Sequence, residues 1–230
     1  MLEWLHAKWL IVDALSPFLA KGLLVTFEIS MLAILIGSAL GFALGTLKTL
    51  PSRALERTIN VYLHVLRGSP YLVQLYIVYF VLPSTGIEWL SFDSFTAAVV
   101  SLSLYTSSYV TEIVASAIRA VPQGQAEAAR SVGMTRAQSL YHVVVPQALK
   151  LTVPPMASVY VIVIKSTAIL SVIGISELTR QGEVAIMRMP GDIMFIYCLI
   201  AFCYFLYCYP VLRFSRWAEG KVGSLGERIE

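Results

Sequence analysis

Five apolar stretches, each about long enough to cross a lipid bilayer, constrain this chain more than any other feature. They cover about residues 22–47, 60–82, 95–118, 151–173 and 193–212. A helix needs about 20 mostly apolar residues to cross the hydrocarbon core. Charged residues make up 13% of the 230 residues, about half of the share that is usual in soluble domains. We therefore predict an all-α, polytopic membrane protein with five transmembrane helices and a short interfacial segment over residues 1–20.

Lysine and arginine residues are distributed unevenly between the segments that connect these stretches. If the N-terminus lies outside and the C-terminus in the cytoplasm, the outer segments hold four of them, Lys8, Lys21, Arg180 and Arg188. The inner segments then hold twelve: Lys48, Arg53, Arg57, Arg67, Arg119, Arg130, Arg136, Lys150, Arg213, Arg216, Lys221 and Arg228. Because cytoplasmic loops carry the excess of positive residues, we predict this orientation, with residues 174–192 as a polar outer loop.

Glycine and proline residues predict how some stretches pack and where they begin. Gly37, Gly41 and Gly45 recur every four residues on one face of the first stretch, a spacing that permits close contact with another helix. Pro70 follows Gly68 directly before a long apolar run. Proline is tolerated in the first turn of a helix, so the second stretch is predicted to begin at about Asn60 or at Ser69.

The amphiphilic segment 121–146 lies between the third and the fourth stretch. Pro122 suits the start of a helix, and Gly133 suits a helix end that needs a positive φ. Thr135, followed three residues later by Gln138, is a capping-box pattern that predicts a second helix start. The segment is therefore predicted to form a helix, a tight turn and a second helix in the cytoplasm.

The residues EAA at 127–129, with Gly133 close behind them, resemble the conserved loop of the permease subunits of binding-protein-dependent ABC importers. RGSPYLVQL at 67–75 and KSTAILSVIGISELT at 165–179 resemble signatures of the polar amino-acid branch of that family, from which Ser166 and Ala168 depart. The similarity extends over about residues 22–217. It implies that residues 119–150 form a coupling-helix loop that docks on an ATPase, through Gly124, Glu127, Ala128, Ala129, Gly133 and Thr135.

The resemblance also implies partners and a location. The whole chain, residues 1–230, would form one transmembrane domain in the bacterial cytoplasmic membrane. It would pair with a second permease chain, identical or homologous, and bind two ATPase subunits that carry the ATP and the magnesium. An extracytoplasmic binding protein would deliver a polar amino acid or a derivative such as an opine. Alternating access to the two sides would follow closure of the ATPase subunits.

Residue patterns for covalent chemistry are missing from the sequence. It contains no GxxxxGK[ST] loop for ATP phosphates, and His6, His64 and His142 lack ligand spacing. Cys198, Cys203 and Cys208 also lack the spacing of a metal site, and a net charge of +3 is too small to indicate a nucleic-acid partner. We therefore expect no catalytic residue, no metal and no cofactor on this chain.

Ionisable residues inside the apolar stretches are candidates for a translocation path, because an unpaired charge in the membrane is costly. For Lys165 we weigh three roles, contact with a substrate carboxylate in the path, an ion pair with a protein carboxylate, or a side chain that extends its charge to the membrane surface. For Glu28 the roles are gate, path or interface. Glu112 is expected to form an ion pair with Arg119 or Arg67 rather than to line the path. Ser166 and Thr167 join the path candidates, although serine and threonine in helices commonly bond to their own backbone.

Two other classes of function are compatible with an integral membrane protein. An ATPase-independent channel or secondary carrier for a small polar solute would not need the loop at 119–150. A membrane scaffold without transport activity would not need the charges at Glu28, Glu112 and Lys165. Both classes therefore fit the sequence less well than a permease.

Overall fold

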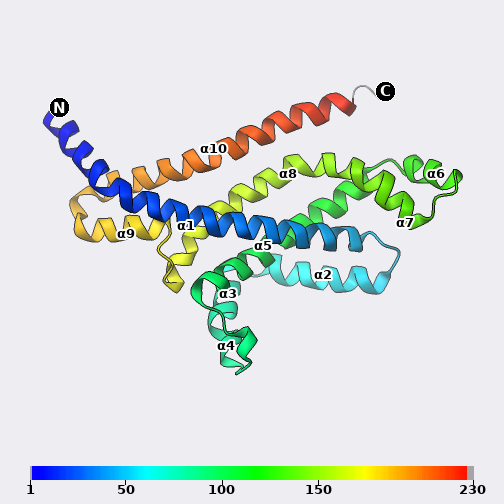
Figure 1. Cartoon of the computed structure of the whole chain (residues 1–230), viewed down its shortest axis with the longest axis horizontal. Helices are drawn as coiled ribbons and strands as arrows, with labels where there is room; N and C mark the ends of the chain where they lie inside the picture. Colours follow the sequence, from blue (N-terminus) through cyan, green and yellow to red (C-terminus); the bar gives the residue numbers. More distant parts are fainter. Residues whose placement is uncertain (1, 227–230) are drawn as a thin grey trace.

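The computed structural model describes residues 2–226, and every regular element in this range is helical (Figure 1). The α-helices are α1 (Leu2–Lys48), α2 (Arg53–Gly68), α3 (Tyr71–Tyr76), α4 (Leu82–Ser84), α5 (Ser94–Ala120), α6 (Gln123–Ser131), α7 (Arg136–Ser139), α8 (Val145–Ser166), α9 (Leu178–Arg188) and α10 (Ile193–Gly226). π-helical turns lie at Ile77–Val81 and Leu140–Val144, and 3-10 segments at Glu88–Leu90, Thr167–Ile173 and Pro190–Asp192. Arg228, which the sequence assigned to the inner tail, lies outside the described residues.

Four helical segments of the described chain are long and apolar enough to cross a membrane: His6–Lys48, Ser94–Ala120, Arg136–Ile173 and Pro190–Gly220. A fifth is obtained if α2 and the helical run from Tyr71 to Ser84 are counted together. The predictions of an all-helical fold and of a polytopic membrane protein are therefore confirmed, with four to five candidate membrane helices.

The second apolar stretch, residues 60–82, is not one straight helix, because it is divided between α2 and a helical run that begins at Tyr71, close to the predicted alternative start at Ser69. Helix α2 ends at Gly68, and the chain turns by 105° before α3 begins. Pro70 is the N-cap of α3, as a proline at a helix start should be. The amide of Gln74 donates to the carbonyl oxygens of Leu66 (2.6 Å) and Ser69 (3.1 Å), and thereby satisfies acceptors that the break in the helix leaves open.

Helix α1 is longer than predicted, because residues 2–20 continue into the first apolar stretch without a break. Leu15 and Leu19 are buried against Leu178 of α9 and Ile196 of α10. This packing stabilises the N-terminal half as a helix, although Pro17 lies inside it. The predicted interfacial segment is therefore an integral part of α1.

The helices that contain the fourth and fifth apolar stretches also extend beyond the predicted bounds. The helix that starts at Arg136 runs through a π-helical turn into α8, so Pro154 and Pro155 lie inside that helix rather than near its start. Met156 and Ala157 are buried, which places this part of α8 in the core despite the lost backbone hydrogen bonds. Helix α10 continues to Gly226.

The predicted polar outer loop at 174–192 is largely helix α9, so the prediction of a loop is wrong for residues 178–188. Leu178, Gly182 and Ala185 are buried and recur at the spacing of one helical face. Gly22 of α1 packs so closely that a Cβ atom there would lie 2.9 Å from Cα of Leu178. Helix α9 is thus a packed element that connects α1 and α10.

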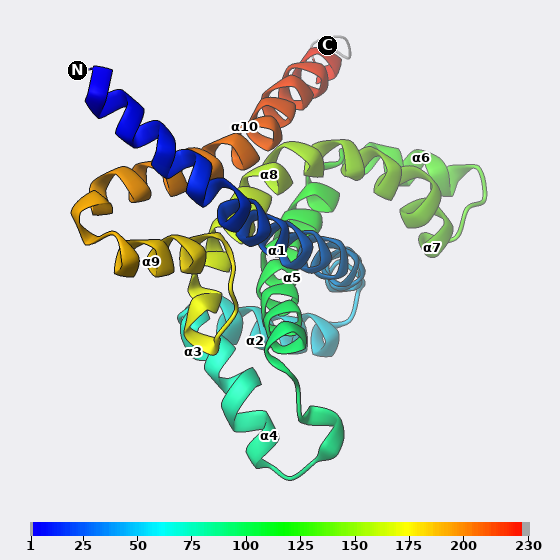
Figure 2. The ribbon, with the colours of Figure 1, turned by 60° about the vertical axis from the view of Figure 1, so that its left-hand side comes forward.

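Helix α1 lies against α5 (Figure 2), and its glycine face makes this contact, which agrees with the predicted close contact with another helix. A Cβ atom at Gly37 would lie 2.6 Å from Cβ of Thr106, and one at Gly41 would lie 2.5 Å from Cβ of Val110. The backbones of α1 and α5 approach closely because these side chains are missing.

The molecule has two distinct ends in Figure 1. The N-terminus and α9 lie at one end, here called the α9 end. The turn between α1 and α2, the helices α6 and α7 and the last turns of α10 lie at the opposite end, here called the α6 end. Helices α3 and α4 leave the bundle sideways between them.

Candidate functional site

The loop at the α6 end has the predicted helix–turn–helix conformation. Pro122 is the N-cap of α6, and Gly133 has a φ of +93°. The hydroxyl of Thr135 accepts from the backbone N–H of Gln138, whose side-chain oxygen accepts from the backbone N–H of Thr135. These contacts are local, so the sequence contains all the information that they require.

The residues of this loop that are predicted to contact an ATPase differ in their solvent exposure. Gly124, Glu127 and Ala128 are exposed, and their surfaces remain open to another protein. Ala129 has an exposed fraction of 6%, and the neighbouring carbonyl of Ala126 accepts from the Ser139 hydroxyl of α7 (3.3 Å). Ala129 therefore lies inside the loop, and its predicted contact with an ATPase stays a prediction.

Two large apolar side chains of the loop are exposed and were not singled out from the sequence. Val132 is 77% exposed and Tyr141 is 72% exposed. Val132 is the C-cap of α6 and directly precedes the positive-φ glycine. Single exposed apolar side chains are common on protein surfaces, so these two residues alone do not identify a contact surface.

Glu112 forms an ion pair, but not with either of the predicted partners. Nζ of Lys48 donates to Oε2 of Glu112 at 2.6 Å, which connects the end of α1 to α5. Arg119 pairs instead with Glu56 of α2 at 3.0 Å. Lys48 is buried and Glu112 is 37% exposed, so the carboxylate remains partly accessible.

Arg67 lies in the last turn of α2, and its side chain is exposed. Its guanidinium lies over the ring of Tyr109, 5.2 Å from the ring centroid, and Tyr109 is near the middle of α5. Arg67, Tyr109 and Glu112 line two adjoining pockets of 400 and 440 Å³ between α2, α5 and α8. We call these joined pockets the Arg67 cleft.

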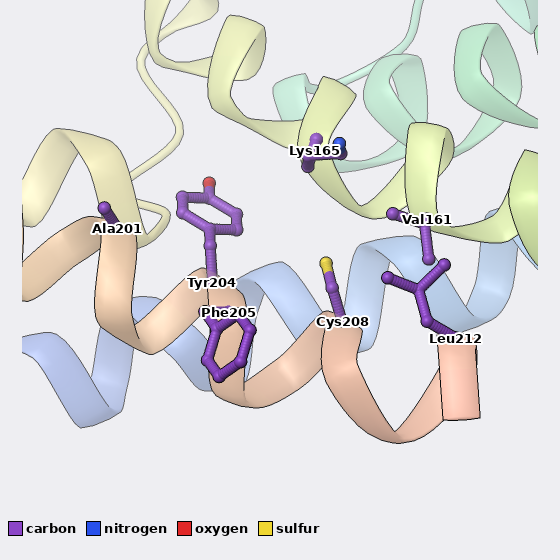
Figure 3. A pocket seen from close by; sticks show the side chains of 7 residues that line it. All are labelled: Val161, Lys165, Ala201, Tyr204, Phe205, Cys208 and Leu212. Atoms are coloured by element: carbon purple, nitrogen blue, oxygen red, sulfur yellow. The ribbon is translucent and has the colours of Figure 1, made fainter. Parts of the chain in front are cut away.

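Lys165 lies in a different pocket, of 440 Å³, between α8 and α10. Tyr204 and Cys208 point from α10 toward α8 in this pocket (Figure 3). Among the described residues, no carboxylate forms an ion pair with Lys165. The structure therefore separates Lys165 from Glu112, although the sequence grouped them as path candidates.

The other path candidates are not among the residues that line these pockets, although Thr167 lies beside Tyr204, which lines the pocket of Lys165. The hydroxyl of Ser166 donates to the carbonyl of Ile162 (2.9 Å) and that of Thr167 to the carbonyl of Ile164 (2.7 Å). Both side chains thus donate to carbonyls of their own helical segment, as serine and threonine in helices commonly do. Glu28 is exposed on α1, with no ion pair in the part of the chain that the structure describes.

The family of binding-protein-dependent transport system inner membrane components matches residues 15–224 of this chain. The chain belongs to this family. The match covers all the candidate membrane helices except the first turns of α1, so family membership applies to the whole bundle and to both ends of the molecule.

The permease is similar to curated relatives and to a solved structure. It is 32% identical over 200 residues to the L-cystine transport system permease protein TcyB of Bacillus subtilis, covering 87% of this chain and 84% of TcyB. It is 34% identical over 175 residues to the glutamine transport system permease protein GlnP of Escherichia coli, covering 76% and 80%.

The solved structures agree with this assignment. A crystal structure of an amino acid ABC transporter with histidines aligns with a TM-score of 0.82 and 33% identity, covering 92% of this permease and 97% of that chain. An inward-facing MetNI methionine ABC transporter aligns with a TM-score of 0.71 at 20% identity, which shows a shared fold.

One buried carboxylate of this permease was placed in an exposed loop by the sequence reasoning. Glu177 is the N-cap of α9 and accepts from the backbone N–H groups of Thr179 and Arg180, each at 2.8 Å. The hydroxyl of Tyr204 donates to it at 3.0 Å. Burial raises the pKa of the Glu177 carboxyl above its ordinary value, and these hydrogen bonds oppose the shift.

Proposed function

We propose that this permease is the membrane-spanning subunit of an ABC importer for a polar amino acid or a close derivative. Family membership and the names of the relatives, which refer to cystine and glutamine transport, support this substrate class. An exposed helix–turn–helix at one end of an apolar bundle carries the proposal, because a membrane subunit needs such a surface to contact a soluble motor.

The proposed orientation places the N-terminus outside and the α6 end in the cytoplasm. Twelve lysine and arginine residues in the inner segments, against four in the outer ones, support this orientation. Residues 1–230 are then one transmembrane domain of the bacterial inner membrane, and residues 119–150 are its cytoplasmic coupling loop.

The proposed coupling surface is the exposed side of α6. Gly124 and Ala128 allow another backbone to approach closely, and Glu127 offers a carboxylate to a basic group. Gly133 and Thr135 fix the angle between α6 and α7. Ala129 supports this surface from inside, since it packs within the loop.

The complete importer would contain one further permease chain, identical or homologous, two ATPase subunits and an extracytoplasmic binding protein. ATP and magnesium would bind to the ATPase subunits. Closure of these subunits would displace α6, and the continuous helix from Arg136 to Ser166 would carry that displacement into the bundle. Glu28, Glu112, Lys165, Ser166 and Thr167 remain the proposed path residues.

A comparison of two neighbouring alanines tests the coupling surface. We expect Ala128→Arg to leave the permease inserted and stable, because Ala128 is exposed. It should reduce recovery of the co-purified ATPase at least about tenfold, since a long side chain at the centre of an interface blocks contact. Ala129→Arg should instead destabilise the permease, because Ala129 is buried.

The matched control is Ala7→Arg, an exposed alanine at the opposite end of α1, which should retain ATPase binding. Normal ATPase recovery by Ala128→Arg would contradict the proposed coupling surface. Substrate uptake by the permease in proteoliposomes without an ATPase would instead support the alternative function, an ATPase-independent channel or secondary carrier.

A further inference from the structure

The last turns of α10 extend past the part of this helix that can lie in the hydrocarbon core. The core is about 30 Å thick, which corresponds to about 20 residues of helix. Counted from Ile193 at the start of α10, this length ends at Leu212, and a tilt of about 20° adds only about one residue. Residues 213–220 therefore lie at the level of the lipid headgroups, at the α6 end of the molecule (Figure 1).

One side of these turns is packed against the rest of the bundle. Ser215 and Ala218 are buried, and the hydroxyl of Ser215 donates to the backbone carbonyl of Pro154 in α8 (3.2 Å). The carboxylate of Glu219 accepts from the same hydroxyl (3.3 Å), so this negative charge lies beside the packed side. The side of α10 that faces α8 is therefore occupied within the chain.

The opposite side of the same turns carries two arginines and two aromatic residues. Arg213, Phe214, Arg216 and Trp217 are exposed and line a surface hollow of 520 Å³. The two arginines are three residues apart and are therefore neighbours on the helix surface, and the two rings have centroids 5.6 Å apart. Neither arginine forms an ion pair with another residue of the described chain. We call these four residues the Arg213 face.

We propose that the Arg213 face binds an anionic phospholipid, with Arg213 and Arg216 on the headgroup phosphate and Phe214 and Trp217 along the acyl chains. A planar guanidinium can hold phosphate oxygens with two parallel hydrogen bonds. Positive residues directly beyond a membrane helix attract anionic lipids, and tryptophan is enriched at the level of the headgroups. A soluble anion would use the arginines alone and leave both rings exposed, whereas a lipid contacts all four side chains.

The bound lipid would stabilise the contact between α10 and α8. Ser215, which bonds to Pro154, lies between Phe214 and Arg216 in the same helical turn. A headgroup that holds both arginines would keep this turn ordered, and with it the hydrogen bond to α8. This inference goes beyond the proposed function and depends on neither the substrate nor the ATPase.

The test measures which lipid lies beside Trp217 in the full-length permease in nanodiscs. Trp4, Trp9 and Trp89 are replaced by phenylalanine, so that Trp217 is the only fluorescent tryptophan. The bilayer is phosphatidylcholine with a minor fraction of phosphatidylglycerol. Dibromo acyl chains, which quench tryptophan, are placed either on the phosphatidylglycerol or on an equal amount of the phosphatidylcholine. The two bilayers then differ only in which lipid carries the quencher.

We expect brominated phosphatidylglycerol to quench Trp217 at least about fivefold more than brominated phosphatidylcholine, since one arginine near an anionic surface contributes about that factor. Arg213→Gln/Arg216→Gln should remove the difference, and Arg213→Lys/Arg216→Lys should keep part of it. The matched control is Arg53→Gln/Arg57→Gln, which changes two exposed arginines of α2 at the same end of the molecule and should leave the difference intact.

Three results would overturn the proposal. The first is equal quenching by the two brominated lipids in the protein with both arginines. The second is a preference for phosphatidylglycerol that survives in Arg213→Gln/Arg216→Gln. The third is a loss of ATPase co-purification by that variant with normal thermal stability in detergent, because the Arg213 face would then be a contact surface for the ATPase.

Discussion

At the scale of single residues, Gly133 has the conformation that a side chain would most disturb. With a φ of +93° and open space around it, a substitution there strains the backbone without a clash. Gly133→Val should cost about 1–2 kcal/mol and lower ATPase co-purification, with normal membrane insertion. Gly86→Val is the control, because Gly86 has a φ of +75° and equally open surroundings in another loop. Equal ATPase recovery from both variants would contradict a coupling role.

The buried carboxyl of Glu177 predicts a pH dependence of stability. Because its folded-state pKa is raised, the native protein keeps this proton at pH values where the unfolded chain has lost it. The contribution of Glu177 to stability therefore falls as the pH rises from the ordinary pKa of a glutamate to the raised pKa in the folded protein. Above the raised pKa the contribution is constant. Melting temperatures of the solubilised permease and of Glu177→Gln should diverge across this window. If the difference between the two melting temperatures did not change with pH, the raised pKa of Glu177 would be refuted.

Residue-scale predictions succeeded where the interactions are local. Gly133, Thr135 and Gln138 lie within six residues of one another, so their spacing alone predicts the turn and the capping box. The partner of Glu112 could not be predicted in this way, because Lys48 is 64 positions away. That ion pair exists only once α1 has packed against α5.

At the scale of elements, the contact between α1 and α5 depends on missing side chains. Gly41→Leu would place atoms within 3 Å of Val110 and force the two helices apart. We expect a loss of at least about 1–3 kcal/mol of stability, seen as a lower melting temperature or poor membrane insertion. Gly220→Leu, where a Cβ meets open space, is the control. Similar melting temperatures for both variants would exclude tight packing at Gly41.

Element boundaries were harder to predict than element type. Pro70 and Gly68 indicated a helix start, but the 105° bend depends on packing of α3 against α5 and on the hydrogen bonds of Gln74. Pro154 and Pro155 suggested a boundary that the core packing of α8 overrides. Helix α9 was not predicted, because its several charged residues indicated a polar loop although Leu178 and Ala185 form a buried face.

At the scale of the whole molecule, orientation is the property that labelling can test. In a background with Cys198, Cys203 and Cys208 replaced by alanine, Glu88→Cys should react with an impermeant thiol reagent in intact cells. Gln125→Cys should react only after permeabilisation, and Gly220→Cys, at the same end of the molecule, should behave identically. Labelling of Gln125→Cys in intact cells would reverse the proposed orientation.

The length of α1 has a consequence for how lipid surrounds this protein. Its 47 residues give a rod of about 70 Å, more than twice the thickness of the hydrocarbon core. Such a rod crosses the bilayer obliquely or extends far beyond it. Because α1 lies along α5 through its glycine face, acyl chains are excluded from that side of α5. The annulus of lipid therefore meets the outer face of α1, where Leu35 and Ile36 are exposed.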